Sequence, residues 1–152
     1  MPGLTYRRAV EADLASIVAL LADDVLGSSR ETSAVEPSAR YREAFAEIQA
    51  DPNQFLCVVE NAGEIVGTLH LTFIPGLSRG GSKRAQIEAV RVLGSRRNER
   101  IGDAMFKWAA DYSREHGCDL MQLTTDKARP DAHRFYDRLG FEATHIGYKM
   151  RL

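Results

Sequence analysis

The stretch that decides the fold is residues 87–102, IEAVRVLGSRRNERIG. Its first six residues are mostly apolar, and Glu88 and Arg91 stand among them as polar residues do on a half-buried strand. Val90 breaks the strict alternation, which indicates either a bulge or burial on both faces. A polar segment follows, and a helical pattern begins at Ile101. The stretch therefore predicts a strand, a loop and the N-terminus of a helix.

The sequence on either side of this stretch carries further strand and helix patterns, separated by glycine, proline, serine and asparagine. The expected elements are a strand at 4–10, helices at 14–25 and 38–48, a hairpin of strands at 55–60 and 64–73, the strand at 84–93, a helix at 101–117, a strand at 120–125, a helix at 130–139 and a closing hairpin at 141–152. Neither G-x-G-x-x-G nor a P-loop occurs. The order predicts an α+β fold with a mixed α/β sheet, in a single domain over residues 1–152.

The composition limits which partners and which cellular compartment we expect for this protein. The chain has 152 residues, 44% of them hydrophobic, which suits one core better than two. Its 20 Lys and Arg against 21 Asp and Glu give a formal charge of −1, so we expect no nucleic-acid and no membrane partner. Cys57 and Cys118 both stand beside apolar residues, as packing thiols of a reducing compartment do. Since no signal core or membrane span is evident, we expect a cytoplasmic protein.

A second informative segment is residues 132–141, AHRFYDRLGF. Together with residues 87–102 it resembles the Gcn5-related N-acetyltransferase (GNAT) family, whose signature is Q/R-x-x-G-x-G/A at a helix start and A-x-x-F-Y-x-x-L-G-F downstream. The second segment matches at every fixed position. The first matches at Arg97 and Gly102 and departs at Arg100, where the family usually has glycine.

The resemblance implies a fold and an activity. The fold is one acyl-CoA acyltransferase domain with a central, mostly antiparallel, splayed sheet flanked by helices. The activity is that of an N-acetyltransferase, which moves an acetyl group from acetyl-CoA to an amine of a small molecule or peptide by direct attack in a ternary complex. Acetyl-CoA is then the cosubstrate, no metal is expected, and a homodimer is a further expectation. The alternative is a non-catalytic acyl-CoA-binding or sensing module.

The first segment supplies the expected donor site. A helix N-terminus carries unpaired N–H groups and about half a positive charge, which suit a pyrophosphate such as that of coenzyme A. The residues expected there are Arg97, Asn98, Glu99, Arg100, Ile101 and Gly102. A side chain at Gly102 would stand between phosphate and amide. The resemblance also implies that the pantetheine arm bonds the backbone of Val90 and Val92 as an added strand would.

Arg100 leaves two conformations open. A positive φ there would cost roughly 1–3 kcal/mol of strain, whereas a negative φ would leave the loop intact and add a cation near the phosphates. We expect the negative φ. The neighbouring arginines are also compatible with a solvated charge run or a nucleic-acid patch, although no aromatic residues are interleaved with them.

The transfer requires two titratable groups, because an amine with a pKa near ~10 must lose a proton and the leaving thiolate benefits from one. Tyr136 occupies the position from which family members commonly protonate the thiolate. Glu88 is the candidate base. The alternatives are a structural Tyr136 that bonds a backbone carbonyl and a Glu88 that pairs with Arg91 or Lys83.

The acceptor site is expected near the acidic residues after the first helix. Asp24 is the candidate substrate-binding residue, with Asp23, Glu31 and Glu36 nearby, although such residues are often only solvated. The four histidines lack metal-ligand spacing with one another and with the cysteines.

Overall fold

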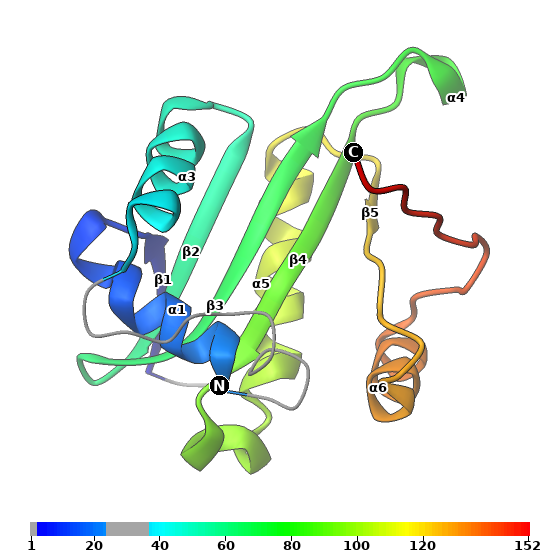
Figure 1. The fold of residues 1–152 in the computed structure, drawn as a ribbon. Helices are drawn as coiled ribbons and strands as arrows, with labels where there is room; N and C mark the ends of the chain where they lie inside the picture. Colours follow the sequence, from blue (N-terminus) through cyan, green and yellow to red (C-terminus); the bar gives the residue numbers. More distant parts are fainter. Residues whose placement is uncertain (1–2, 24–36) are drawn as a thin grey trace.

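The computed structural model describes residues 3–23 and 37–152, and its centre is one sheet (Figure 1). The strands of the described ranges are β1 (Leu4–Arg8), β2 (Gln54–Asn61), β3 (Glu64–Ile74), β4 (Arg84–Val92) and β5 (Leu120–Gln122), in the spatial order β1-β2-β3-β4-β5. Neighbouring strands from β1 to β4 are antiparallel, and β4 and β5 are parallel. This arrangement confirms the mostly antiparallel mixed sheet of an α+β fold.

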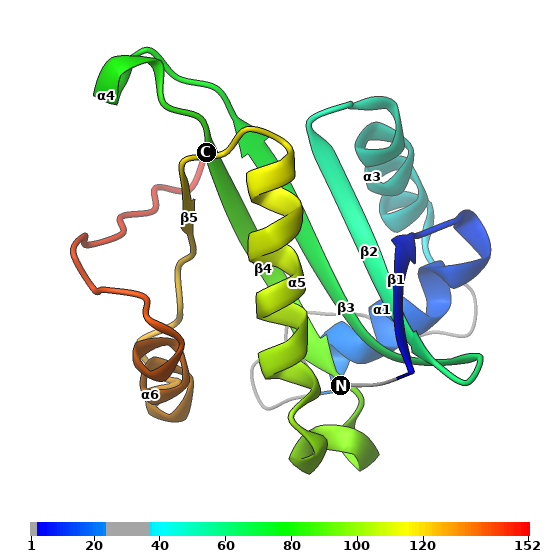
Figure 2. The same cartoon turned by 180° about the vertical axis from the view of Figure 1, so that it is seen from behind.

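Helices cover both faces of the sheet. The 3₁₀ turn η1 (Glu11–Asp13), α1 (Leu14–Ala22) and α3 (Ala39–Ala50) lie on one face, and α5 (Ile101–Glu115) lies on the other, as Figures 1 and 2 show from opposite sides. One turn, α4 (Ser78–Gly81), lies between β3 and β4. The 3₁₀ segment η2 (Gly94–Glu99) leads from β4 into α5, and α6 (Pro130–Leu139) follows β5.

The alternation of β2 explains why two cores form. Phe55, Cys57 and Val59 belong to the cluster under α5, whereas Leu56 and Val58 belong to the cluster under α1 and α3. Successive residues of a strand point to opposite faces, so a continuous apolar run is what a sheet covered on both sides requires. Burial raises the pKa of the Cys57 thiol to about 12, as expected of a packing thiol.

Aromatic contacts fix α5 and α6 in place. Trp108 and Tyr112 of α5 stack with ring centroids 4.8 Å apart, and Tyr6 of β1 stacks on Trp108 at 4.6 Å. On α6, Phe135 and Tyr136 meet Phe106 of α5 edge-on at 5.6 and 5.7 Å. These contacts hold α6 beside the N-terminal half of α5.

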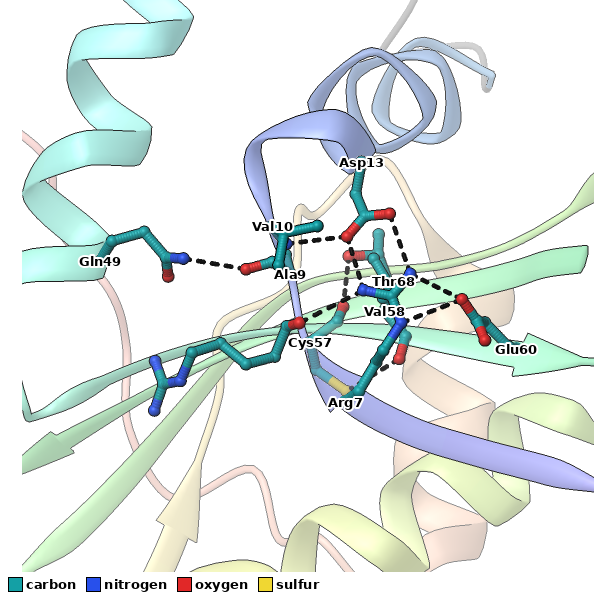
Figure 3. Close-up of polar contacts among 10 residues, drawn as sticks. Arg7, Ala9, Val10, Asp13, Gln49, Cys57, Val58, Glu60 and Thr68 are labelled. Atoms are coloured by element: carbon teal, nitrogen blue, oxygen red, sulfur yellow. Dashed lines mark hydrogen bonds and ion pairs between the residues drawn. The ribbon is translucent and has the colours of Figure 1, made fainter. Parts of the chain in front are cut away.

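A partly buried polar network ties β1 to η1 and β2 (Figure 3). Arg7 donates to both carboxylate oxygens of Asp13 at 2.7 and 3.0 Å and to Glu60 at 2.6 and 3.0 Å. The amide N–H of Val10 also donates to Asp13, at 2.8 Å. The hydrogen bonds from Arg7 hold the pKa of Asp13 below its ordinary value, although burial acts in the opposite direction. Asp13 therefore remains ionised and anchors the entry to α1.

Several element predictions are confirmed and one is wrong. The hairpin forms with Asn61 opposite Glu64, whereas β5 ends three residues earlier than expected, at Gln122. The closing hairpin is absent, because residues 141–152 contain no strand. The edge strand of the described sheet, β5, is only three residues long and offers this segment little to pair with. In residues 3–23 and 37–152, no helix combines the length and apolar character needed to cross a bilayer.

Candidate active site

A bulge interrupts β4 where the sequence pattern predicted an irregularity. His70 pairs with Glu88 and Thr68 pairs with Arg91, so β4 contains one more residue than β3 between these pairs. Ala89 takes up the extra length with φ 52°. A bulge of this kind bends the strand and redirects its side chains. It therefore changes the direction of β4 at its middle.

Beyond the bulge, one edge of β4 has no neighbouring strand among the described residues. Its pairing with β5 extends only from Arg84 to Gln86, where the side-chain amide of Gln122 donates to that of Gln86 at 2.8 Å. The two strands then diverge (Figure 1). The sheet is therefore splayed between β4 and β5, as the family resemblance implies.

The backbone of this edge is available for hydrogen bonding. The N–H of Leu93 donates to the carbonyl of Val66 in β3 at 2.8 Å. Because peptide groups alternate in direction along a strand, that of Val92 points away from β3, towards the open edge. Val90 lies within the bulge, where this alternation is interrupted. The carbonyl of Val90 accepts a hydrogen bond from Arg91 Nη1 at 2.9 Å.

The expected negative φ of Arg100 is wrong. Arg100 stands between η2 and α5 with φ 60° and ψ 25°, in the left-handed region. Glycine occupies this region without steric cost, which gives a physical reason for a glycine at this point of the motif. The Arg100 side chain turns to solvent, 76% exposed, and its Nε donates to Asp103 at 2.9 Å.

The other residues of the expected donor loop have different surroundings. Arg97 donates to the backbone carbonyl of Asp23 at 2.8 Å, which ties η2 to the end of α1. Glu99 accepts from Arg96 at 2.5 Å. Asn98 is exposed, and Ile101 is fully buried in the core under α5. The loop is thus held by its own side chains, and its backbone amides stand at the N-terminus of α5.

Asp103 brings two cations to that helix end. Besides Arg100, the guanidinium of Arg138 on α6 reaches Asp103 at 3.1 Å. Burial acts to raise the pKa of Asp103, but the hydrogen bonds from the two arginines outweigh it, and the pKa lies below its ordinary value. The carboxylate is therefore matched by two positive charges beside the unpaired N–H groups of the helix.

Gly102 packs against α6. A Cβ at this position would lie 3.5 Å from Cζ of Phe135, which is an ordinary van der Waals contact. A larger side chain would displace the Phe135 ring or enter the space in front of the helix N-terminus.

Tyr136 is half-buried, and its ring packs among Phe106, Phe135 and Phe141. Its hydroxyl makes no hydrogen bond to any residue in the described ranges. Burial raises the pKa of this hydroxyl above its ordinary value, while the positive charges of Arg91 and Arg129 act against the rise. The group is therefore protonated at neutral pH, with two cations close enough to act on it.

Glu88 is exposed on the face of the sheet that carries α1 and α3. It makes no ion pair within residues 3–23 and 37–152. Lys83, one of its expected partners, instead donates to the carbonyl of His116 at 2.8 Å. Glu88 faces His70 across the β3–β4 pair, and its charge acts on that imidazole.

The candidate substrate-binding residue, Asp24, lies outside the described residues.

The polar set around His70, which also contains Gln54 and Thr72, was not identified from the sequence as part of a site. Its signal was the alternation of polar and apolar residues at 68–73. No group of three metal-ligating side chains comes together in the described part of the chain.

Comparisons with known proteins agree with the sequence motifs. The family model described as "Acetyltransferase (GNAT) family" matches residues 21–141. The aminoalkylphosphonate N-acetyltransferase of Salmonella typhimurium is 30% identical over 154 residues, which cover 100% of this chain and 94% of that protein. The glucosamine 6-phosphate N-acetyltransferase of Trypanosoma brucei brucei is 37% identical over 82 residues, 53% of each chain.

A solved structure with the same fold comes from Bacillus halodurans and is described as a transcriptional regulator. It superimposes with a TM-score of 0.93, at 49% identity, and covers 98% of this chain and 99% of its own.

Proposed function

This chain belongs to the acetyltransferase (GNAT) family and is an N-acetyltransferase, and we propose that it binds acetyl-CoA along the open edge of β4 and acetylates a small amine that carries a phosphonate or phosphate group. The family uses acetyl-CoA as its acetyl donor. The observation that carries the proposed site is the splayed edge of β4 beyond the bulge, which leads to the N-terminus of α5.

The residues present fit coenzyme A at two places. The outward peptide group of Val92 is a proposed partner for an extended ligand that binds as an added strand would, and the N–H of Val90 is a second one. The turn at Arg100 and the first amides of α5, at Ile101 and Gly102, offer N–H groups and a positive dipole end to a pyrophosphate. When bound, acetyl-CoA supplies a thioester with an electrophilic carbonyl and a thiolate leaving group.

Tyr136 is the proposed proton donor to that thiolate. Its hydroxyl is protonated at neutral pH and is not used in a structural hydrogen bond within the described ranges, which supports the catalytic interpretation over the structural one. Arg91 and Arg129 stabilise the tyrosinate that forms when the proton leaves, because both act on the hydroxyl. The N–H of Val90 or Val92 is the proposed donor to the oxygen of the tetrahedral intermediate.

The acceptor class rests on the relatives and on these cations. Both relatives described above act, by name, on amines that carry a phosphonate or phosphate group. An acceptor of this class places an anion a few bonds from the reacting nitrogen. Arg91 and Arg129, whose charges act on the Tyr136 hydroxyl, are the proposed contacts of that anion, because arginine binds phosphonates and phosphates with paired N–H groups. Asp24 is retained as a proposed contact of the acceptor amine.

The test compares matched amines in initial-rate measurements of free CoA thiol. We expect aminoalkylphosphonates to have a kcat/KM at least about 10-fold above alkylamines of equal chain length, the effect of roughly 1.4 kcal/mol of binding. Arg129→Ala should reduce that preference. Arg134→Ala is the control on the same helix, since Arg134 is exposed and pairs with Asp131. Equal rates for both amine classes would reject the phospho-amine acceptor.

A DNA-binding role is not carried over from the Bacillus halodurans relative. The longest described helix is α5, and its cations are matched by acidic neighbours: Lys107 and Arg114 both pair with Asp111. A helix of mixed charge lacks the basic face that phosphate contacts require.

A homodimer and a cytoplasmic location also remain proposals. Four large apolar side chains alternate along the C-terminal segment and are 75–115% exposed: Ile146, Tyr148, Met150 and Leu152. Exposed apolar residues at alternate positions suit pairing with a second copy of the chain. Light scattering of the chain with and without residues 146–152 tests the dimer. A monomer in both cases would reject it.

A further inference from the structure

The two faces of β3 differ: the face under α5 is apolar and buried, whereas the opposite face carries polar side chains. On β3, Leu69, Leu71 and Phe73 are 0%, 0% and 5% exposed under α5. On the other face, His70 and Thr72 are only half-buried. They share that face with their cross-strand partners Leu56, Gln54 and Glu88, because directly opposite residues lie on the same side of a sheet.

Hydrogen bonds in this polar set determine which nitrogen of His70 is basic. The side-chain oxygen of Gln54 lies 2.7 Å from His70 Nε2 and accepts from Thr72 Oγ1 at 2.9 Å. The amide nitrogen of Gln54 donates to Asp51 at 3.5 Å, and its oxygen faces the histidine. An amide oxygen only accepts, so Nε2 must carry the hydrogen. The neutral ring then has its lone pair on Nδ1.

Nδ1 of His70 makes no hydrogen bond to the residues in the described ranges. Burial lowers the pKa of His70 below its ordinary value, and the carboxylate of Glu88 acts in the opposite direction. Glu88 from β4 is the charged group that acts on the ring, and β2 presents the neutral Leu56 and Gln54 to it, with Asp51 beyond Gln54. The imidazole is thus neutral at pH 7 and has a carboxylate beside it.

The position of this pair relates it to the transfer site. Glu88 directly precedes the bulge residue Ala89, and Val90 of the open edge follows. The donor is expected between β4 and β5, with its phosphates at α5 on one face. An acceptor that approaches the same point of β4 from the other face meets Glu88 and His70.

We propose that His70 is the group that removes the proton from the acceptor ammonium, and that Glu88 stabilises the imidazolium so formed. This inference rests on the proposed function of the β4 edge. One ammonium proton moves to Nδ1, directly or through one water, and the freed nitrogen lone pair forms the C–N bond to the thioester carbonyl. The C–S bond breaks, and the thiolate takes the proton of Tyr136. The second nitrogen proton restores the tyrosine hydroxyl, and His70 releases its proton to solvent.

The chemistry favours an imidazole in this role. A base is most effective when its pKa lies near the working pH, because it is then both unprotonated and sufficiently basic. A neutral imidazole meets this condition, and a neighbouring carboxylate reduces the cost of its positive charge. Glu88 is thus assigned as a charge partner of the base, a refinement of its predicted role as the base itself.

The test is the pH profile of kcat/KM for wild type and His70→Gln with one amine acceptor. Wild type should lose activity on the acid side as His70 becomes protonated, at a pH below its ordinary value of about 6.5. His70→Gln should be about 10²–10³-fold slower at pH 7. Its rate should rise about tenfold per pH unit towards the amine pKa, because only unprotonated amine reacts. CoA affinity should be unchanged, and His145→Gln, an exposed control, should behave as wild type.

Two further variants should shift the acid limb of the kcat/KM profile, the pH range in which activity is lost on acidification, in opposite directions. Glu88→Gln removes the charge that raises the pKa of His70, so the limb should move to lower pH. Gln54→Glu keeps an acceptor for Nε2 and adds a negative charge, so the limb should move to higher pH. A wild-type profile in His70→Gln, or a loss of rate by one factor at every pH, would overturn the role of His70. Absence of amine-dependent CoA release in wild type would instead reject the proposed function.

Discussion

Replacing Arg100 by glycine isolates the backbone strain at the turn before α5. Arg100 has φ 60° and ψ 25°, in the left-handed region where a side chain costs about 1–2 kcal/mol. Glycine avoids this cost. It also lowers the free energy of unfolding by about 0.4–1 kcal/mol, because the unfolded chain has more conformations with glycine. Comparison with Arg100→Ala cancels the lost ion pair to Asp103, since both variants lack the guanidinium. We expect the glycine variant to be about 0.5–1 kcal/mol more stable than the alanine variant.

The assay is urea unfolding of the two variants, with the same pair of substitutions at Lys107 as the control. Lys107 is an exposed residue inside α5, where glycine costs about 1 kcal/mol relative to alanine. The sign of the difference should therefore reverse between the two sites. If glycine were the less stable choice at position 100 as well, no left-handed strain would be stored there and the explanation of the motif glycine would fail.

Two other variants test the network around η1 and the donor loop. Asp13→Asn should cost about 1–3 kcal/mol at pH 7, because the hydrogen bonds of Arg7 lose their charged acceptor. The pKa of Asp13 is depressed, so its contribution is fully present above the ordinary carboxyl pKa and is lost as pH falls below it; a gap to wild type that does not narrow in acid would contradict this. Gly102→Glu should abolish the thermal stabilisation by CoA, whereas Gly102→Ala, whose Cβ meets Phe135 at an ordinary 3.5 Å, should retain it. Equal CoA-induced shifts in both folded variants would place the pyrophosphate elsewhere.

The sequence predicted the elements whose cause is local. The broken alternation at Val90 indicated either a bulge or burial on both faces, and the structure has the bulge, because an extra residue changes which side chains are apolar. The hairpin of β2 and β3 was predicted because Asn61 and Gly63 allow a tight reversal, and Gly63 indeed has φ 82°. The α5 face was predicted from apolar residues at helical spacing.

The missed features depend on contacts between distant parts of the chain. The φ of Arg100 is set by how η2 joins α5, and an arginine does not reveal a position that glycine usually fills. The closing hairpin was predicted from strand propensity, which context can override, and residues 141–152 form no strand. His70 was predicted only as a residue without metal-ligand spacing, because its partner Gln54 comes from another strand and Glu88 from a third.

The most direct test of the account measures acetyl transfer and CoA binding on wild type and Tyr136→Phe. The variant keeps the ring among Phe106, Phe135 and Phe141 and removes only the hydroxyl. Wild type should release one CoA thiol per N-acetylated amine, and the variant should be about 10²–10⁴-fold slower in kcat with unchanged CoA affinity. A variant with full activity, or a wild type that binds CoA and releases none when an amine is added, would contradict catalysis by Tyr136 at the open edge of β4.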